Sequence, residues 1–167
     1  LAIALDHKPH AACIVPEKRQ ELTTEGGLDV VAGRAVLAPV IDRLKGAGIR
    51  VSLFIDPDAA QIETAAALGA PVVEFHTGIY CLAEGAARLG ELERLCRASA
   101  TAKDMGLECH AGHGLSFESV GDIAAIPQLS ELNIGHFLVG EAIFCGLTQA
   151  IVQMRALMDQ ARVGTGG

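Results

Sequence analysis

The stretch from Arg50 to Phe75 reads RVSLFIDPDAAQIETAAALGAPVVEF and decides the fold. It opens with an apolar run, Arg50–Ile55, continues with an alanine-rich segment, Asp58–Leu68, and ends with a second apolar run, Pro71–Phe75. Gly69 lies between the segment and the second run, where a left-handed glycine commonly ends a helix. This order predicts two parallel strands joined by a helix, which is a βαβ unit.

The same alternation extends over the rest of the chain. Three more strands are expected, at Ala11–Val15, Leu107–Ala111 and Leu132–Val139. Four more helices are expected from apolar residues at helical spacing, at Val31–Lys45, Leu82–Met105, Phe117–Ile126 and Glu141–Arg162. Glycines again separate helices from strands, at Gly46, Gly48 and Gly106. The sequence therefore predicts an α/β fold with a parallel sheet of about five βα units.

Composition bounds the class of protein. The 167 residues predict one domain, residues 1–162, with a flexible tail at 163–167. Half of the residues are hydrophobic, and the net charge of −7 argues against a nucleic-acid or anionic-membrane surface. No apolar run approaches the ~20 residues of a membrane span. The five cysteines lack C-x-x-C spacing, which indicates buried free thiols in a reducing cytosol.

Ionisable residues follow several of the expected strands. In parallel α/β folds, ligands bind at the carboxyl ends of the strands. Glu74, flanked by Val73 and Phe75, is costly to bury unless it is paired or protonated, and we expect desolvation to raise its pKa. The alternative for Glu74 is a carboxylate hydrogen-bonded for structure alone. His113 lies between two glycines at a strand end, a position that favours a functional role.

Two further stretches suggest anion binding. Gly135 and His136 lie in an expected strand, and Gly140 is expected to open the last helix, where backbone N–H groups can bind phosphate. A core histidine beside structural glycines is the competing interpretation of His136. The polar stretch 16–29, PEKRQELTTEGGLD, is expected to be a loop, either a mobile cover for a phosphate or an ordinary solvated loop.

A zinc site is not expected. His110, His113, His136 and Cys109 offer ligand types, but residues three apart on an extended strand point to opposite faces. No spacing of a known metal motif is present. The sequence therefore predicts no metal-binding residues.

Several of these stretches resemble one family. KPHAACIVPEKRQELTTEGGLDV, VSLFIDPD, EFHTGIY, AGHGLSFESV and IPQLSELNIGHFLVGEAI together are similar to the pyridoxine 5′-phosphate synthase family, over nearly the whole chain up to about Arg162. The resemblance implies a TIM (β/α)8 barrel, assembled as a homo-octamer in the cytoplasm. It implies that 1-deoxy-D-xylulose 5-phosphate condenses with 3-amino-2-oxopropyl phosphate to give pyridoxine 5′-phosphate, inorganic phosphate and water. No cofactor is implied.

The resemblance also assigns roles to residues. His113 of AGHG would be the general acid, and Glu74 of EFHTG would be the carboxylate that stabilises the transition state. Thr23 of ELTTEGG would contact deoxyxylulose phosphate. Gly114, together with Gly135 and His136 of NIGH, would bind the aminooxopropyl phosphate.

The chain departs from the family pattern in three ways. His110 stands where the family has Asn, and Glu141 stands where it has Arg, which bears on phosphate affinity. The chain begins at Leu1 in LAIALDHKPH, which is typical of the end of a helix. A full barrel has about 250 residues, so we expect a piece that lacks about 80 N-terminal residues. Because those residues would carry further catalytic groups, the piece is expected to be inactive alone.

Two alternatives remain open at this stage. One is another phosphate-binding barrel, an isomerase or an aldolase, although the lysines that such enzymes use for Schiff bases are expected here in loops and helices. The other is a non-catalytic half-barrel that binds a phosphorylated metabolite or serves in assembly, which predicts binding without turnover.

Overall fold

The computed structural model describes residues 1–16 and 26–163. Its centre is a five-stranded sheet in the order β1-β2-β3-β4-β5, with every neighbouring pair parallel. The strands are β1 (Ala11–Ile14), β2 (Arg50–Ile55), β3 (Val72–His76), β4 (Glu108–Gly112) and β5 (Leu129–Asn133). The predicted parallel α/β fold is confirmed, and the arrangement is consistent with part of a TIM-like barrel.

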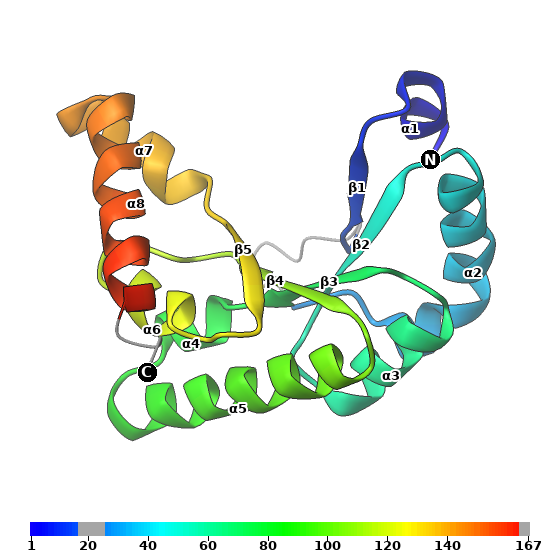
Figure 1. Ribbon diagram of the computed structural model, residues 1–167, viewed down its shortest axis with the longest axis horizontal. Helices are drawn as coiled ribbons and strands as arrows, with labels where there is room; N and C mark the ends of the chain where they lie inside the picture. Colours follow the sequence, from blue (N-terminus) through cyan, green and yellow to red (C-terminus); the bar gives the residue numbers. More distant parts are fainter. Residues whose placement is uncertain (17–25, 164–167) are drawn as a thin grey trace.

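One helix precedes the first strand, the other helices follow strands, and together they form an arc along one side of the sheet (Figure 1). They are α1 (Ala2–His7), α2 (Val30–Gly46), α3 (Ala59–Ala67), α4 (Gly78–Leu82), α5 (Gly85–Asp104), α6 (Val120–Ala124), α7 (His136–Cys145) and α8 (Leu147–Val163). Side-chain caps begin two of them, since Asp29 accepts from the N–H of Ala32 and Asp58 accepts from that of Ala60. The expected left-handed glycine is present before β3, where Gly69 has φ 71°.

Two predicted helices differ from those in the structure. The segment expected over Leu82–Met105 forms α5, which begins at Gly85, and Leu82 ends the short helix α4. The segment expected over Glu141–Arg162 is divided at Gly146, φ 84°, into α7 and α8. A positive φ is accessible to glycine and interrupts the helical hydrogen bonding, which explains the division at Gly146. Glu141 consequently lies inside α7 and not at the start of a helix.

The fifth strand lies earlier in the sequence than predicted. It covers Leu129–Asn133, and the apolar run that begins at His136 forms helix α7. Periodicity alone cannot separate a short apolar strand from a buried-type helix, and Ser130 and Glu131 conceal the strand. His136 is thus the first residue of a helix, and Gly140 lies within that helix instead of opening it.

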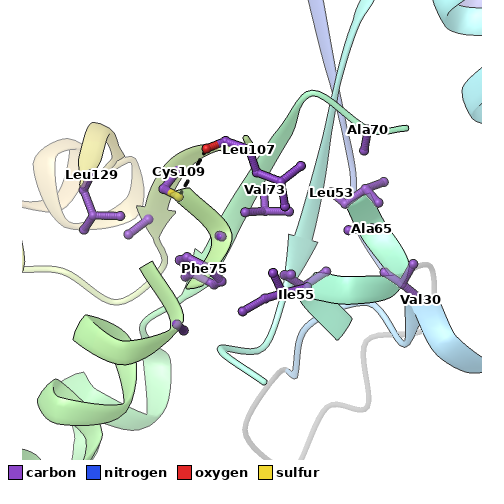
Figure 2. Close-up of a cluster of buried hydrophobic side chains, with 14 of the residues drawn as sticks. Val30, Leu53, Ile55, Ala65, Ala70, Val73, Phe75, Leu107, Cys109 and Leu129 are labelled. Carbon is purple, nitrogen blue, oxygen red and sulfur yellow. Dashed lines mark hydrogen bonds between the residues drawn. The ribbon is translucent and has the colours of Figure 1, made fainter. Parts of the chain in front are cut away.

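The hydrophobic core lies between the sheet and the helices. Figure 2 shows Leu53, Ile55, Val73, Phe75 and Cys109 converging there from β2, β3 and β4. All five side chains are fully buried. As predicted, Val73 and Phe75 share this face of β3, which leaves the opposite face to Glu74 and His76.

All five cysteines are free, as predicted. Their predicted burial holds only for Cys109. Cys13, Cys96 and Cys145 are exposed, because they lie on an edge strand or on outward-facing helical positions, and Cys81 is half-buried. Among the described residues, no helix is both long and apolar enough to cross a membrane.

Candidate functional site

The face of the sheet opposite the hydrophobic core carries polar side chains. Residues paired between parallel strands share a face, and residues two apart in one strand also share it. The register therefore places these residues on one surface: Cys13, Arg50, Ser52, Phe54, Glu74, His76, Glu108, His110, Glu131 and Asn133. Most of them can ionise or form hydrogen bonds, so this face is the candidate site.

Glu74 lies near the middle of this face, on β3. Only 9% of the residue is exposed. The Cys13 thiol donates a hydrogen bond to Glu74 Oε2 with a sulfur–oxygen distance of 3.6 Å. Burial raises the pKa of Glu74, as predicted, and the nearby imidazole of His110 partly opposes that rise. A carboxyl group with a raised pKa is suited to proton transfer or to the stabilisation of developing positive charge.

The Cys13 thiol is a weak partner for that carboxyl group. Although the residue as a whole is exposed at the edge strand β1, its sulfur faces Glu74. Burial and the neighbouring carboxylate raise the pKa of Cys13 to about 12. The thiol therefore stays protonated near neutral pH and can act as a hydrogen-bond donor, not as a nucleophile.

An ionic network occupies the amino-terminal end of the same face. His110 Nε2 lies 2.8 Å from Glu108 Oε1, and its Nδ1 lies 3.6 Å from Glu131 Oε1. Arg50 forms an ion pair with Glu108. Hydrogen bonds from His110 and Arg50 hold the pKa of Glu108 down at about 2. The network thus links β2, β4 and β5 beside Glu74.

Two histidines meet at the carboxyl end of β3. The ring centroids of His76 and His113 are 5.0 Å apart, and Phe54 contacts the His76 ring edge-on at 5.3 Å. His76 Nδ1 lies 3.2 Å from Asp56 Oδ1 at the end of β2. Nε2 of His76 is buried and has no hydrogen-bond partner among the described residues. Such an atom costs about 1–3 kcal/mol, so it calls for an explanation.

The backbone at His113 explains why glycines flank this histidine. His113 has φ 84° and Gly114 has φ 82°, a left-handed pair that reverses the chain after β4. Thr77 holds the turn, because its hydroxyl lies 2.8 Å from the carbonyl of Gly112 and 2.6 Å from that of His113. A left-handed conformation is costly for a residue with a Cβ, and strain of this kind is concentrated at functional sites.

Gly112 adds a second constraint. A Cβ at this position would lie 2.6 Å from Glu74 Oε1 and 2.7 Å from the carbonyl oxygen of Asn133. No room exists there for any larger residue. The absence of a side chain at Gly112 is therefore what lets Glu74 lie against β4 and β5.

The structure brings some of the predicted site residues together. Glu74 and His76 share one face of β3, and the ring of His76 contacts that of His113 at the carboxyl end of the strand. Gly114 is exposed beside Cys81 and Gly78. Thr23 lies outside the described residues, as does most of the loop predicted at 16–29.

The predicted phosphate-binding pair lies at the start of α7. Gly135 is the N-cap residue of α7, His136 is its first residue, and both are exposed. A helix start of this kind presents backbone N–H groups and suits an anion. Phe137, next in the helix, packs edge-on against Phe117 at 4.8 Å, which connects α7 to the segment that follows His113.

Sequence reasoning missed two features of the site. The ion-pair network of His110 was missed because its members come from three strands whose register the sequence does not reveal. The pairing of Asp56 with His76 was missed for the same reason, although both residues were visible at strand ends. Within the described residues, no three His, Cys, Asp or Glu side chains are grouped to hold a metal ion.

Comparisons with known proteins agree with the resemblance. The profile of the family described as pyridoxal phosphate biosynthesis protein PdxJ matches residues 1–160. A protein of Rhodospirillum rubrum named pyridoxine 5′-phosphate synthase is 63% identical over 165 residues, and one of Gluconobacter oxydans with the same name is 60% identical over 157. These matches cover 98% and 94% of this chain, and 66% of each relative.

A third relative is more distant. The pyridoxine 5′-phosphate synthase of Zymomonas mobilis is 56% identical over 162 residues, which cover 97% of this chain and 63% of the relative. The chain thus spans just under two thirds of the length of these relatives.

Proposed function

Because the chain belongs to the family described as pyridoxal phosphate biosynthesis protein PdxJ, we propose that the protein makes pyridoxine 5′-phosphate. The substrates are 1-deoxy-D-xylulose 5-phosphate and 3-amino-2-oxopropyl phosphate, and the other products are inorganic phosphate and water. The observation that carries the proposal is the polar face of the sheet, where buried Glu74 shares one face of β3 with His76, whose ring contacts that of His113.

The reaction needs groups that move protons. The amine attacks the ketone, water leaves, phosphate is eliminated, and closure of a carbon–carbon bond is followed by aromatisation. Two molecules of water leave in total, and with them the atoms of the two substrates balance those of pyridoxine 5′-phosphate and inorganic phosphate, so no external oxidant or reductant is required. Each step transfers a proton, and a positioned acid or base contributes about 10²–10⁴-fold to such a step.

We assign these roles to two residues. His113 donates a proton to the departing oxygen, and the turn held by Thr77 keeps its imidazole at the carboxyl end of β4. Glu74 stabilises positive charge that develops on the condensing nitrogen. Burial raises the pKa of this carboxyl group, a perturbation that is common among active-site carboxylates.

Phosphate binding is assigned to the loops around these residues. Gly114, Gly135 and His136 bind the phosphate of 3-amino-2-oxopropyl phosphate with backbone N–H groups and the α7 helix start. Thr23, outside the described residues, contacts deoxyxylulose phosphate. Two anchored phosphates hold the reacting atoms in register, which lowers the entropic part of the barrier.

The alternatives have less support. A Schiff-base aldolase needs a lysine that reaches the site, but among the described residues Lys8 caps α1 and the other lysines lie in α2 and α5. A half-barrel without catalysis would need neither a strained histidine at the end of β4 nor a buried carboxylate on the same face of the sheet. We also propose a closed (β/α)8 barrel in a cytoplasmic homo-octamer. Sedimentation of the purified protein would test the octameric state.

The direct test is turnover by the protein expressed from its complete reading frame. Purified protein is mixed with both substrates, and pyridoxine 5′-phosphate and inorganic phosphate are quantified, with a yield of one to one expected. The Glu74→Gln variant is expected to lower kcat by about 10²–10³-fold, as loss of one preorganised electrostatic group does. The His113→Asn variant is expected to lose about 10²–10⁴-fold.

The matched control is Glu63→Gln, an equivalent change at an exposed position of α3, and its kcat should equal that of the wild type. Absence of pyridoxine 5′-phosphate from the wild-type reaction would overturn the proposed function. Full turnover by Glu74→Gln would overturn only the role of Glu74.

A further inference from the structure

His76 is a buried side chain with two different nitrogen environments. Its side chain is 1% exposed. Nδ1 lies 3.2 Å from Asp56 Oδ1, whereas Nε2 has no hydrogen-bond partner in the described part of the chain. An aromatic ring without nitrogens would fill the same space and leave no polar atom unsatisfied. Packing alone therefore does not account for a histidine here.

Asp56 fixes the tautomer of this histidine. The hydrogen bond from His76 lowers the pKa of Asp56, so the carboxylate is ionised near neutral pH. A carboxylate only accepts hydrogen bonds, which places a proton on Nδ1 of His76. The N–H of Gly27 donates to the same Oδ1 at 3.1 Å. Asp56 is thus held from a second direction, and the plane of the His76 ring is held with it.

The ring of His76 in turn bounds the ring of His113. The two centroids lie 5.0 Å apart, and Phe54 touches both rings, at 5.3 Å from His76 and 6.2 Å from His113. Gly78 lies against both rings, because a Cβ there would lie 2.5 Å from His76 Nε2 and 3.3 Å from His113 Cδ2. The ring of His76 therefore packs against one side of the His113 ring, and a rotation of His76 would change the orientations that are open to His113.

We propose that Asp56 and His76 form a positioning pair that orients the imidazole of His113 for proton donation. Asp56 holds His76 by its Nδ1 proton, and His76 holds His113 by ring contact. Neither residue of the pair is assigned a contact with substrate. The proposal rests on the proposed function, since it concerns the acid step assigned to His113.

The His76→Phe variant separates this role from packing. It keeps the ring and removes both nitrogens, so a purely structural role predicts unchanged kcat. The positioning role predicts that kcat falls about 10- to 100-fold, part of the ~10²–10⁴-fold that a positioned acid supplies, while KM is unchanged. Asp56→Asn should produce a similar fall, because an amide no longer dictates which nitrogen of His76 carries the proton.

The double variant tests whether the two residues act as one unit. If they do, adding Asp56→Asn to His76→Phe lowers kcat no further, whereas independent roles would multiply the two losses. The matched control is Ser99→Ala in α5. Like Nε2 of His76, the Ser99 hydroxyl is buried and has no hydrogen-bond partner among the described residues, but it does not belong to the pair or to the His113 site. The kcat of this variant should be unchanged.

A second readout does not require turnover. Diethyl pyrocarbonate modifies exposed imidazoles, and peptide mass spectrometry measures the rate at His113, which is half-buried. The rate should rise several-fold in His76→Phe and Asp56→Asn and remain at the wild-type value in Ser99→Ala. Unchanged rates at His113, or unchanged kcat in both variants, would overturn the positioning role. A wild-type protein without turnover but with these altered rates would overturn the proposed function instead.

Discussion

The two faces of the same five strands follow different rules. Leu53, Val73 and Phe75 point toward the helices, and each is fully buried without any polar atom in its side chain. Glu74 and His76, which alternate with them along β3, are nearly as buried but carry ionisable groups. Because successive residues of a strand point to opposite sides, one pentapeptide supplies both surfaces.

The difference separates stability from chemistry. Burial of the apolar face stabilises the fold by about 25 cal/mol for each Å² of apolar surface removed from water, and these side chains need no specific partner. Burial of the polar groups on the other face costs free energy. Contacts such as Cys13 with Glu74 and Asp56 with His76 offset only part of that cost. Substitutions on the first face should therefore change folding, and those on the second should change turnover.

The largest expected effect on stability is that of Phe75→Ala. Phe75 is fully buried in the core cluster, and truncation leaves a cavity beside Ile55 and Cys109 (Figure 2). The free energy of unfolding should fall by about 3–5 kcal/mol. Denaturant titration followed by circular dichroism measures it. Val36→Ala, at a position of α2 that is 72% exposed, is the control and should remain within about 0.5 kcal/mol of the wild type.

That prediction sharpens the comparison because the adjacent residue behaves in the opposite way. Glu74→Gln, the variant that should abolish most turnover, removes a buried ionisable group and should not lower stability at neutral pH. If Phe75→Ala left unfolding unchanged, or if Glu74→Gln unfolded the protein, the division of labour between the faces would be wrong.

Gly112→Ala should affect both properties to a moderate extent. The new Cβ would lie 2.7 Å from the carbonyl oxygen of Asn133, so β4 and β5 must separate, and 2.6 Å from Glu74 Oε1, so that carboxyl group must move. A loss of about 1–3 kcal/mol in the free energy of unfolding is expected, together with reduced kcat.

Gly90→Ala is the matched control for Gly112→Ala. Gly90 lies in α5, and its Cβ would meet nothing within 4 Å. Alanine is about 0.5–1 kcal/mol better than glycine inside a helix, so this variant should be slightly more stable and fully active. A Gly112→Ala protein with the same properties would show that Glu74 does not depend on the space that Gly112 leaves.

The sequence predicted the parallel α/β sheet and singled out individual candidate residues for the site. Alternation of apolar and polar residues around β3 predicted which face Glu74 occupies, and the flanking glycines singled out His113. The partners could not be predicted, because the contact of Asp56 with His76, and those of His110 with Glu108 and Glu131, depend on strand register and side-chain rotamers. The fifth strand was misplaced because the apolar run at the start of α7 carries no periodicity that separates helix from strand.

Two carboxylates of the polar face should give pH effects of opposite sign, the smallest effects expected here. Glu74 has its pKa raised in the folded protein, mainly by burial, so its contribution favours folding below its ordinary pKa of 4.5 and is lost as the pH rises through the raised value. Glu108 has its pKa lowered to about 2 by hydrogen bonds from His110 and Arg50. Its contribution is present above 4.5 and is lost as the pH falls toward 2.

Urea unfolding at a series of pH values separates the two contributions. Glu74→Gln should flatten the decline in stability as the pH rises above 4.5, and Glu108→Gln should flatten the decline as the pH falls below 4.5. Glu63→Gln, exposed on α3, should alter neither decline. A change in stability below pH 4.5 in Glu74→Gln would contradict the comparison. Glu74 would then be a carboxylate stabilised by a partner, and not the desolvated group that its place on the buried polar face requires.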